Sequence, residues 1–394
     1  MNKVVGIFWR FLLLGMVSFG GPAAHIGYFQ KTFVQRLHWL DQTSYAKLIA
    51  LSQFLPGPGS SQIGFALGYR QAGLGGAIAA FVGFTLPSFL LLYLLATSLG
   101  VTAHDELITA IVKGFKLLAV VVVADAVITM FKSFCQSSLT IFVAAFSAIV
   151  LTFLPSLLTQ MAVLLIAAAI GSYVAYAKRA EQMHSNDENS SKAIAQTPSA
   201  QFSRLPFVIF VALFIGLPLV ASHSAWLQLF SDFYTSGSLV FGGGHVVLPL
   251  LQQTIGDSVT TDQFLTGYAA AQAVPGPMFT LASFLGATVM VEHSFYGALL
   301  ATLAIFLPGF LLILALQGSW DHWASKAKVA GAVSAINAAV VGLLLAALYQ
   351  PVAISAITSM VDVVLVGIAL AILRFTKLHI IFFVVAFALL GLVL

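Results

Sequence analysis

Two short segments of the sequence carry residues that could bind an anion. QFLPGPGSSQ occupies positions 53–62, and QAVPGPMFT occupies positions 272–280. A proline removes a backbone N–H and clashes with the preceding helical turn, and it drives the residue before it out of the helical region. Each proline–glycine–proline break therefore predicts the end of one helix and the start of another. The new helix begins with unpaired N–H groups and the positive end of its dipole, which attract anions.

These two breaks supply the first candidate substrate-binding residues. Their backbone N–H groups and the neighbouring hydroxyl and amide side chains are hydrogen-bond donors. The candidates are Gln53, Pro56, Gly57, Pro58, Gly59, Ser60, Ser61 and Gln62 in the first segment, and Gln272, Pro275, Gly276, Pro277 and Thr280 in the second. A plain kink or loop at each break is the alternative.

A second pair of motifs combines consecutive glycines with a histidine. The motifs are GMVSFGGPAAH (15–25) and GSLVFGGGHVV (237–247). Gly20 and Gly21 allow a close backbone approach to a substrate or another helix interruption, although glycine pairs also form packing faces in membrane helices. His25 and His245 are candidates for proton coupling. Each could equally be a polar group satisfied inside a helix bundle.

Charged residues within apolar sequence form a third group. Lys113, Lys116 and Asp125 lie in the stretch 107–131, and a charge at the centre of a span costs about 2.5–3.5 kcal/mol and usually marks function. The two lysines share a helix face, and with Arg36 they could supply positive charge to an anion. Lys113 could instead snorkel, and Arg36 could contact lipid headgroups. Asp125 lies nearly opposite Lys116 and is a candidate for proton coupling or for a structural ion pair.

The composition indicates that the solvent of this chain is lipid. Of 394 residues, 60% are hydrophobic and 8% are charged, whereas soluble domains carry about 25% charged residues. A span needs about 20 apolar residues, so the chain has room for many spans. Cys135 is the only cysteine, which excludes an internal disulfide. The basic residues are scattered, and there is no P-loop or metal-binding spacing. We therefore expect no nucleic-acid partner, no cofactor and no metal, and any driving force would be an ion gradient.

The two halves of the sequence repeat one another. FLLLGMVSFGG (11–21), TLPSFLLLYLL (85–95) and KGFKLLAVVVV (113–123) align in order with FYTSGSLVFGG (233–243), FLPGFLLILAL (306–316) and SAINAAVVGLL (334–344). The paired breaks fall in the same register. The N-terminus could pass for a signal peptide, but a cleaved signal would not recur in the second half. We therefore expect residues 1–24 to stay in the mature protein.

These patterns predict an all-α polytopic membrane protein with about 12–13 hydrophobic segments in two homologous, inverted repeats. We place the first repeat at 1–177, a polar cytoplasmic linker at 178–204, a connecting helix at 205–222 and the second repeat at 223–394. The odd number of spans between repeat starts predicts opposite orientations, which satisfies the positive-inside rule for most basic residues. Lys31, Arg36 and Lys47 break that rule. A flat amphipathic segment at 28–42, or breaks that re-enter rather than span, would explain them.

Inverted repeats would let the two breaks meet near the bilayer midplane. Paired discontinuous helices of this kind form the substrate sites of many secondary transporters. An anion channel lined by the same breaks is an alternative class. An intramembrane enzyme with Ser60 or Ser61 as nucleophile is a third, and it would need His25 within hydrogen-bonding reach. We expect a transport protein and not an enzyme.

Four stretches also carry a resemblance to a known family. They are SFGGP near the first span, WLDQTSYAKLIALSQFLPGPGSSQ (39–62), VFGGGHVVLPLL and AAAQAVPGPMFTLASFLG (269–286). The chain resembles the two-domain members of the chromate ion transporter family over both halves, about 350 residues. Members of that family also occur as half-length proteins that work in pairs, and many carry asparagine where this chain has Gly59.

The resemblance implies a multi-pass protein of the bacterial inner membrane that exports the chromate dianion and confers chromate resistance. The oxyanion would bind the helix ends after each break, with Lys116, Lys113 or Arg36 supplying charge. Asp125 or a histidine would couple transport to protons. Transport of sulfate or another oxyanion, and passive anion conduction, are the alternatives, and a homodimer is left open.

Overall fold

The computed structural model is helical throughout the part of the chain that it describes. It describes residues 3–393 apart from 20, 102–105, 186–201, 242–243, 321–322, 324–325, 377 and 379. No strand occurs within those ranges. The predicted all-α class is confirmed.

The first half begins with short helices and continues with long ones. Its elements are α1 (Lys3–Val17), α2 (Gly21–Phe29), the π-helical η1 (Gln30–Arg36), α3 (Gln42–Phe54), α4 (Gly59–Val101), α5 (Glu106–Phe134), α6 (Ser138–Phe153) and α7 (Leu157–Ser185). Helix α3 begins after Asp41, whose carboxylate accepts hydrogen bonds from the N–H and the hydroxyl of Ser44. Helix α4 is interrupted at Ala72 and Gly73, where φ of the glycine is +58°, so it consists of two consecutive helices.

The second half repeats this order after a connector. The connector is α8 (Arg204–Val220) with η2 (Ala221–His223). The second half contains α9 (Ala225–Leu239), η3 (Gly244–Val246), α10 (Val247–Ile255), α11 (Thr261–Ala273), η4 (Met278–Thr280), α12 (Leu281–Val289), η5 (Val291–His293), α13 (Ser294–Leu316), α15 (Ala327–Ala347), η6 (Leu348–Ala353), α16 (Ile354–Ala356), α17 (Met360–Phe375) and α18 (Ile380–Gly391). Helix α8 occupies the range expected of the connecting helix. Helix α7 runs to Ser185, beyond the boundary expected at 177, and most of the expected linker lies outside the described residues.

Several helices have the length and composition of membrane spans. Five of the described helical stretches qualify, namely Gly59–Ser98, Leu157–Arg179, Arg204–His223, Val291–Leu316 and Ala327–Ala356, and three shorter apolar helices accompany them. The outer face of α6 exposes Phe142, Phe146 and Phe153. Such an apolar outer surface fits a lipid environment, because lipid does not penalise its exposure. The chain is therefore a multi-pass membrane protein.

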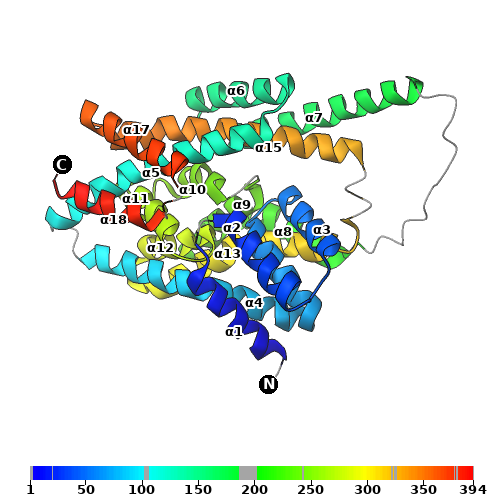
Figure 1. Cartoon of the computed structure of the whole chain (residues 1–394), viewed down its shortest axis with the longest axis horizontal. Coiled ribbons are helices and arrows are strands. Elements are labelled where there is room, and N and C mark those ends of the chain that lie inside the picture. Colours follow the sequence, from blue (N-terminus) through cyan, green and yellow to red (C-terminus); the bar gives the residue numbers. More distant parts are fainter. Residues whose placement is uncertain are drawn as a thin grey trace.

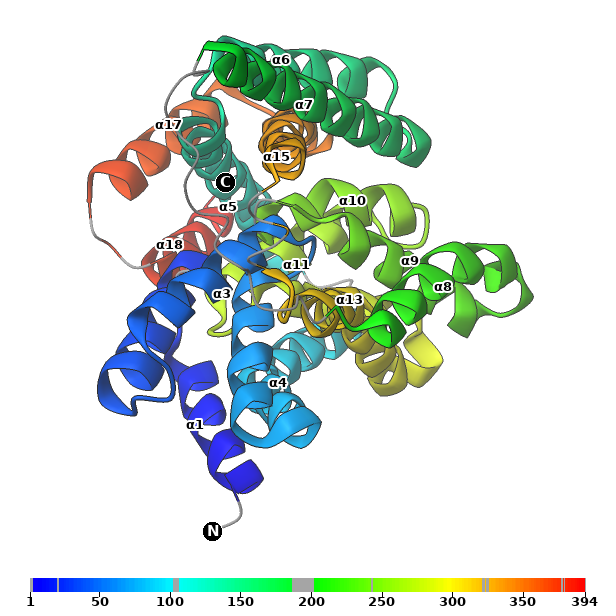
Figure 2. The ribbon, with the colours of Figure 1, turned by 90° about the vertical axis from the view of Figure 1, so that its right-hand side faces the viewer.

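The two halves exchange their last helices. Helix α5 of the first half packs against α17 and α18 of the second, and α15 of the second half packs against α6 and α7 of the first. In both views α6, α7, α15 and α17 lie in one layer, apart from α1 and α4 (Figures 1 and 2). Glycines permit these crossings, since a Cβ on Gly331 would overlap the Gly171 carbonyl, and one on Gly114 would overlap the Phe387 carbonyl.

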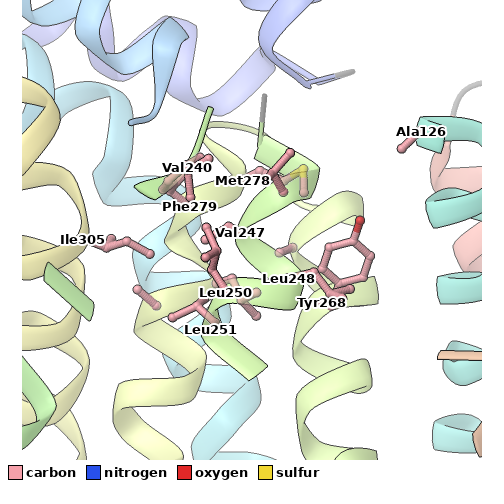
Figure 3. Packing of buried hydrophobic residues seen from close by; sticks show 14 of the residues in the cluster. Ala126, Val240, Val247, Leu248, Leu250, Leu251, Tyr268, Met278, Phe279 and Ile305 are labelled. Carbon is pink, nitrogen blue, oxygen red and sulfur yellow. The ribbon is translucent and has the colours of Figure 1, made fainter. Parts of the chain in front are cut away.

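The second layer holds the remaining repeated segments. Helix α1 packs against α4, and its counterpart α9 packs against α13. Val240, Tyr268 and Ile305, from different segments of the second half, are fully buried at this centre (Figure 3). Close packing here fixes the backbone on either side of the second break, because a filled interior tolerates little displacement.

Candidate anion-binding site

Both breaks have the backbone geometry that their prolines and glycines dictate. Helix α3 ends at Phe54, with Leu55 extended, and α4 begins at Gly59. Helix α11 ends at Ala273, with Val274 extended, and η4 follows at Met278. The central glycines, Gly57 and Gly276, have φ of +116° and +101°, a region that side chains other than glycine rarely adopt.

Each break is hydrogen-bonded to the opposite half of the chain. The Gly57 N–H donates to the Val240 carbonyl at 2.7 Å, and the Gly276 N–H donates to the Ser18 carbonyl at 2.9 Å. Ser18 and Val240 precede the equivalent double-glycine motifs. The first break also approaches the leucine–proline motif of the second half, since a Cβ on Gly57 would lie 3.0 Å from the Cα of Gly309. The break, the double-glycine motif and the leucine–proline motif, all repeated in the sequence, therefore meet where the two halves join.

His25 connects the two breaks inside the protein. Its Nδ1 lies 3.1 Å from Ser60 Oγ, in the first turn of α4, and its Nε2 lies 3.2 Å from the Ser18 carbonyl. Because a carbonyl only accepts, Nε2 carries the proton, and the neutral ring accepts the Ser60 hydroxyl proton at Nδ1. The same Ser18 carbonyl accepts from Gly276. His25 is thus satisfied in the bundle interior, and it lies where a change of protonation would reorient Ser60.

Buried oxygen atoms at the junction of the two breaks have no hydrogen-bond partner within the described part of the chain. They are Ser18 Oγ, Ser61 Oγ and Gln62 Oε1. Ser61 is only 3% exposed and Ser18 is fully buried, so an unmet hydrogen bond at each is costly. The Gln62 amide nitrogen donates to the carbonyls of Pro56 and Gly309. The first turn of α4 thus combines the unpartnered hydroxyl group of Ser61 with a helix N-terminus.

At the second break, the polar side chains form hydrogen bonds within the protein. The Thr280 hydroxyl donates to the Pro277 carbonyl at 2.6 Å. The Gln272 amide donates to Met278 Sδ at 2.9 Å, and His245 Nδ1 lies 2.9 Å from the Tyr268 hydroxyl. Gln53, which aligns with Gln272, is exposed instead. The two breaks therefore share a backbone geometry but differ in the donors that they can offer a ligand.

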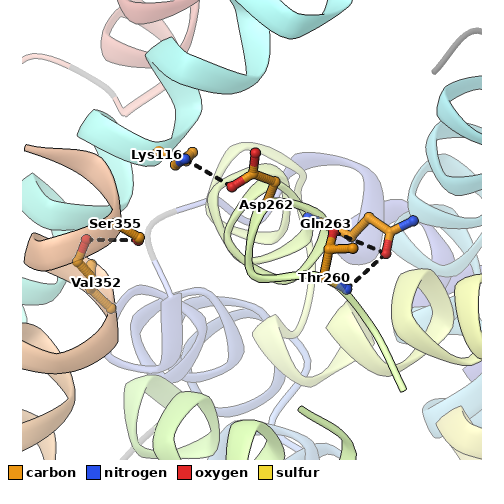
Figure 4. A network of polar contacts seen from close by, with 6 residues as sticks. All are labelled: Lys116, Thr260, Asp262, Gln263, Val352 and Ser355. Carbon is orange, nitrogen blue, oxygen red and sulfur yellow. Dashed lines mark hydrogen bonds and ion pairs between the residues drawn. The ribbon is translucent and has the colours of Figure 1, made fainter. Parts of the chain in front are cut away.

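The candidate charges lie in ion pairs or at the surface rather than at the breaks. Lys116 Nζ lies 2.8 Å from Asp262 Oδ1 (Figure 4), and Arg374 Nη1 lies 2.8 Å from Asp125 Oδ1. The contact of Asp125 with Arg374 corresponds to the structural ion pair that the sequence offered as one alternative. Lys113 is partly buried on the same helix, and Arg36 is exposed at the end of η1.

Asp262 and Arg374, the partners in these ion pairs, were not among the candidate residues predicted from the sequence. Each is a charge near or within apolar sequence of the second half, which is the signal that could have found them. Of the glycine motif, Gly21 begins α2 with φ of +72°, whereas Gly20 lies outside the described residues. No group of three metal-binding side chains occurs among the residues that the structure covers.

A hollow of about 330 Å³ opens beside the first break. It is lined by Phe54, Leu55 and Pro56 before the break, by Phe241 of the second glycine motif, by Ser172 of α7, and by Lys328, Val329, Ala332 and Val333 of α15. The second break does not line it. Lys328 is not among the candidate binding residues that the sequence offered, so its place beside the break is a finding of the tertiary structure.

The fold and this site define a duplicated helical membrane protein whose halves interlock at two broken helices. The sequence profile of the chromate transporter family matches residues 5–172 and 227–392. The chain belongs to that family, and the two matches confirm the duplication. No solved structure matches the chain.

Relatives of this chain cover most of its length. A chromate transport protein of Cupriavidus metallidurans is 28% identical over 97% of this chain and 91% of its own length. A chromate transport protein of Pseudomonas aeruginosa is 26% identical over 86% and 78%, respectively. An uncharacterized transporter of Methanocaldococcus jannaschii is 26% identical over 87% and 83%. The similarity therefore extends over both halves in each case.

Proposed function

We propose that this protein exports chromate, or a similar tetrahedral oxyanion, across the bacterial inner membrane by secondary active transport, and so confers chromate resistance. Membership of the chromate transporter family supports transport as the activity. The names of the bacterial relatives support chromate as the substrate. Sulfate is the chief alternative, because it has the same shape and charge.

One observation carries this proposal. The two broken helices are bonded to each other's halves, through Gly57 to Val240 and Gly276 to Ser18. At that junction, the N-terminus of α4 presents the unpartnered hydroxyl group of Ser61. A helix N-terminus and a free hydroxyl group suit an oxyanion, which accepts several hydrogen bonds at once. If the repeats are inverted, rocking of one half against the other would expose this junction to each side in turn.

The interior hydrogen bond between His25 and Ser60 also meets the geometric condition for a serine nucleophile. However, Ser60 and His25 are both buried, and neither lines the hollow. The second ring nitrogen of His25 is held by a backbone carbonyl and not by a carboxylate. We therefore interpret the bond as part of the transport junction.

Chromate uptake into inside-out membrane vesicles tests the proposal. We expect the wild-type chain to accumulate radiolabelled chromate, sulfate to compete, and collapse of the proton gradient to abolish accumulation. We expect Pro56→Leu, at equal protein level, to lose uptake, because a leucine would allow α3 to continue through the break. Chromate movement that never exceeds its own gradient would instead identify a channel. Vesicles that move neither chromate nor sulfate would refute oxyanion transport.

A further inference from the structure

The hollow beside the first break marks a difference between two equivalent pairs of helices. In the register of the repeats, α3 corresponds to α11 and α15 corresponds to α5. Helix α11 packs along α5, whereas among the described residues α3 has no comparable packing against α15. The hollow occupies that place, between the end of α3 and the start of α15. The two halves are therefore in contact at the α11–α5 position (the closed position) and separated by the hollow at the equivalent α3–α15 position (the open position).

Charge distinguishes the closed position from the open one. At the closed position, Lys116 of α5 pairs with Asp262 of α11 at 2.8 Å (Figure 4). The residue of α15 that aligns with Lys116 is Asn337, which is buried and whose Oδ1 has no partner in the described structure. The open position thus lacks the corresponding ion pair, and its wall carries a different cation, Lys328.

Lys328 lines the hollow and contacts two residues of α7. Its ammonium lies 4.1 Å from the ring centroid of Tyr176, and the Ser172 hydroxyl donates to its backbone carbonyl at 3.0 Å. Among the described carboxylates, none pairs with it. The other walls are largely apolar: Phe54, Phe241 and Val333. Low-dielectric walls around one sign of charge concentrate the field and attract the opposite charge.

We propose that this hollow is the mouth through which the oxyanion reaches the first break, and that Lys328 is the cationic residue that binds it there. The hollow reaches Pro56, and the N-terminus of α4 follows three residues later. The mouth lies beside α7, whose later turns carry Lys178 and Arg179, and the positive-inside rule assigns that side to the cytoplasm. An exporter must take up its substrate there. This inference rests on the proposed function.

The first test compares two neighbouring lysines. Lys326 also lies over an aromatic ring, 4.2 Å from that of Trp323, but it does not line the hollow. In proteoliposomes we expect Lys328→Gln to raise the KM for chromate roughly fivefold or more, with a smaller change in kcat and a weaker dependence on salt. Lys328→Arg should keep most of the affinity, and Lys326→Gln should resemble the wild type. Equal effects of Lys326→Gln and Lys328→Gln would overturn the assignment.

The second test does not depend on transport. A cysteine is introduced as Ala332→Cys, in a chain whose own Cys135 is replaced by serine, and it is labelled with an anionic thiol reagent. We expect rapid labelling in inside-out vesicles, slow labelling in right-side-out vesicles, and slower labelling when chromate is added. If the wild type transports chromate but chromate does not slow the labelling, the hollow is not the entrance for the oxyanion, while the proposed function stands. If no oxyanion is transported, the proposed function itself fails.

Discussion

At the scale of single residues, two glycines determine how the halves join. Gly57 and Gly276 each adopt a positive φ and donate a backbone N–H to the other half. Neither has room for a side chain, because a Cβ on Gly276 would lie 2.8 Å from Ser88 Oγ. The sequence placed both glycines between prolines, but only the folded chain shows that each glycine is also a contact between the halves.

We expect Gly57→Ala and Gly276→Ala to abolish transport or to lower the amount of folded protein. A residue other than glycine at positive φ costs about 1–3 kcal/mol, and the added methyl group would push the halves apart. Gly216→Ala is the matched control, because that helical glycine has open space around it. Uptake per unit of purified protein and thermal unfolding in detergent measure the two effects. Normal uptake and stability of Gly57→Ala would show that the junction is not fixed by this glycine.

At the scale of elements, helix α5 is fastened to the second half at two points. Lys116 joins it to α11 and Asp125 joins it to α17. The side chain of Lys116 is 18% exposed, whereas that of Asp262 is 58% exposed. An ion pair with one partner in solvent stabilises a fold by only about 0–1 kcal/mol. We therefore expect the Lys116–Asp262 ion pair to act mainly by holding α5 and α11 together in one state of the transport cycle.

We expect Lys116→Ala and Asp262→Ala to lower chromate uptake to a similar extent without lowering the amount of protein. The exchanged pair, Lys116→Asp with Asp262→Lys, should recover at least about half of the activity, because the attraction is restored. A double-mutant cycle on initial uptake rates measures the coupling. Loss of uptake in Lys116→Ala together with normal uptake in Asp262→Ala would mean that Lys116 contacts the oxyanion directly.

At the scale of the whole molecule, the exchange of helices makes each half depend on the other. Helix α15 packs against α6 and α7, and α5 packs against α17 and α18. Glycine contacts such as Gly171 with Gly331 bring these helices close. If one half of the chain were isolated, its exchanged helices would expose the surfaces that they bury against the other half. The same packing would hold the halves together without the linker.

We therefore expect a chain divided between residues 190 and 191 to function when both pieces are made together. Each piece expressed alone should be degraded, because its exchanged helices lack partners. Co-purification through a tag on one piece and chromate uptake by the pair are the measurements. Stable accumulation of the first piece alone would show that the exchanged packing contributes little to stability.

Much of the fold and part of the site followed from local sequence. Helix breaks at Leu55 and Val274 and the duplication were readable, because proline, glycine and repeated landmarks act over a few residues. The same reasoning identified Ser60, Ser61 and Gln62, in the first turn of α4, as candidate donors. The inverted orientation of the repeats and the roles of the candidate residues stay predictions.

The pairing of distant groups was decided only by the tertiary structure. The sequence left the partners of Lys116 and Asp125 unidentified, and folding supplied Asp262 and Arg374. The sequence did not offer Lys328 as a binding residue, and folding placed it in the hollow beside Pro56. The physical reason is that backbone preference is local, whereas a charge is satisfied by whichever group packing brings within a few ångströms. Composition and breaks thus determined a duplicated membrane helix bundle, and the contact between its halves decided which side chains line the hollow beside the first break.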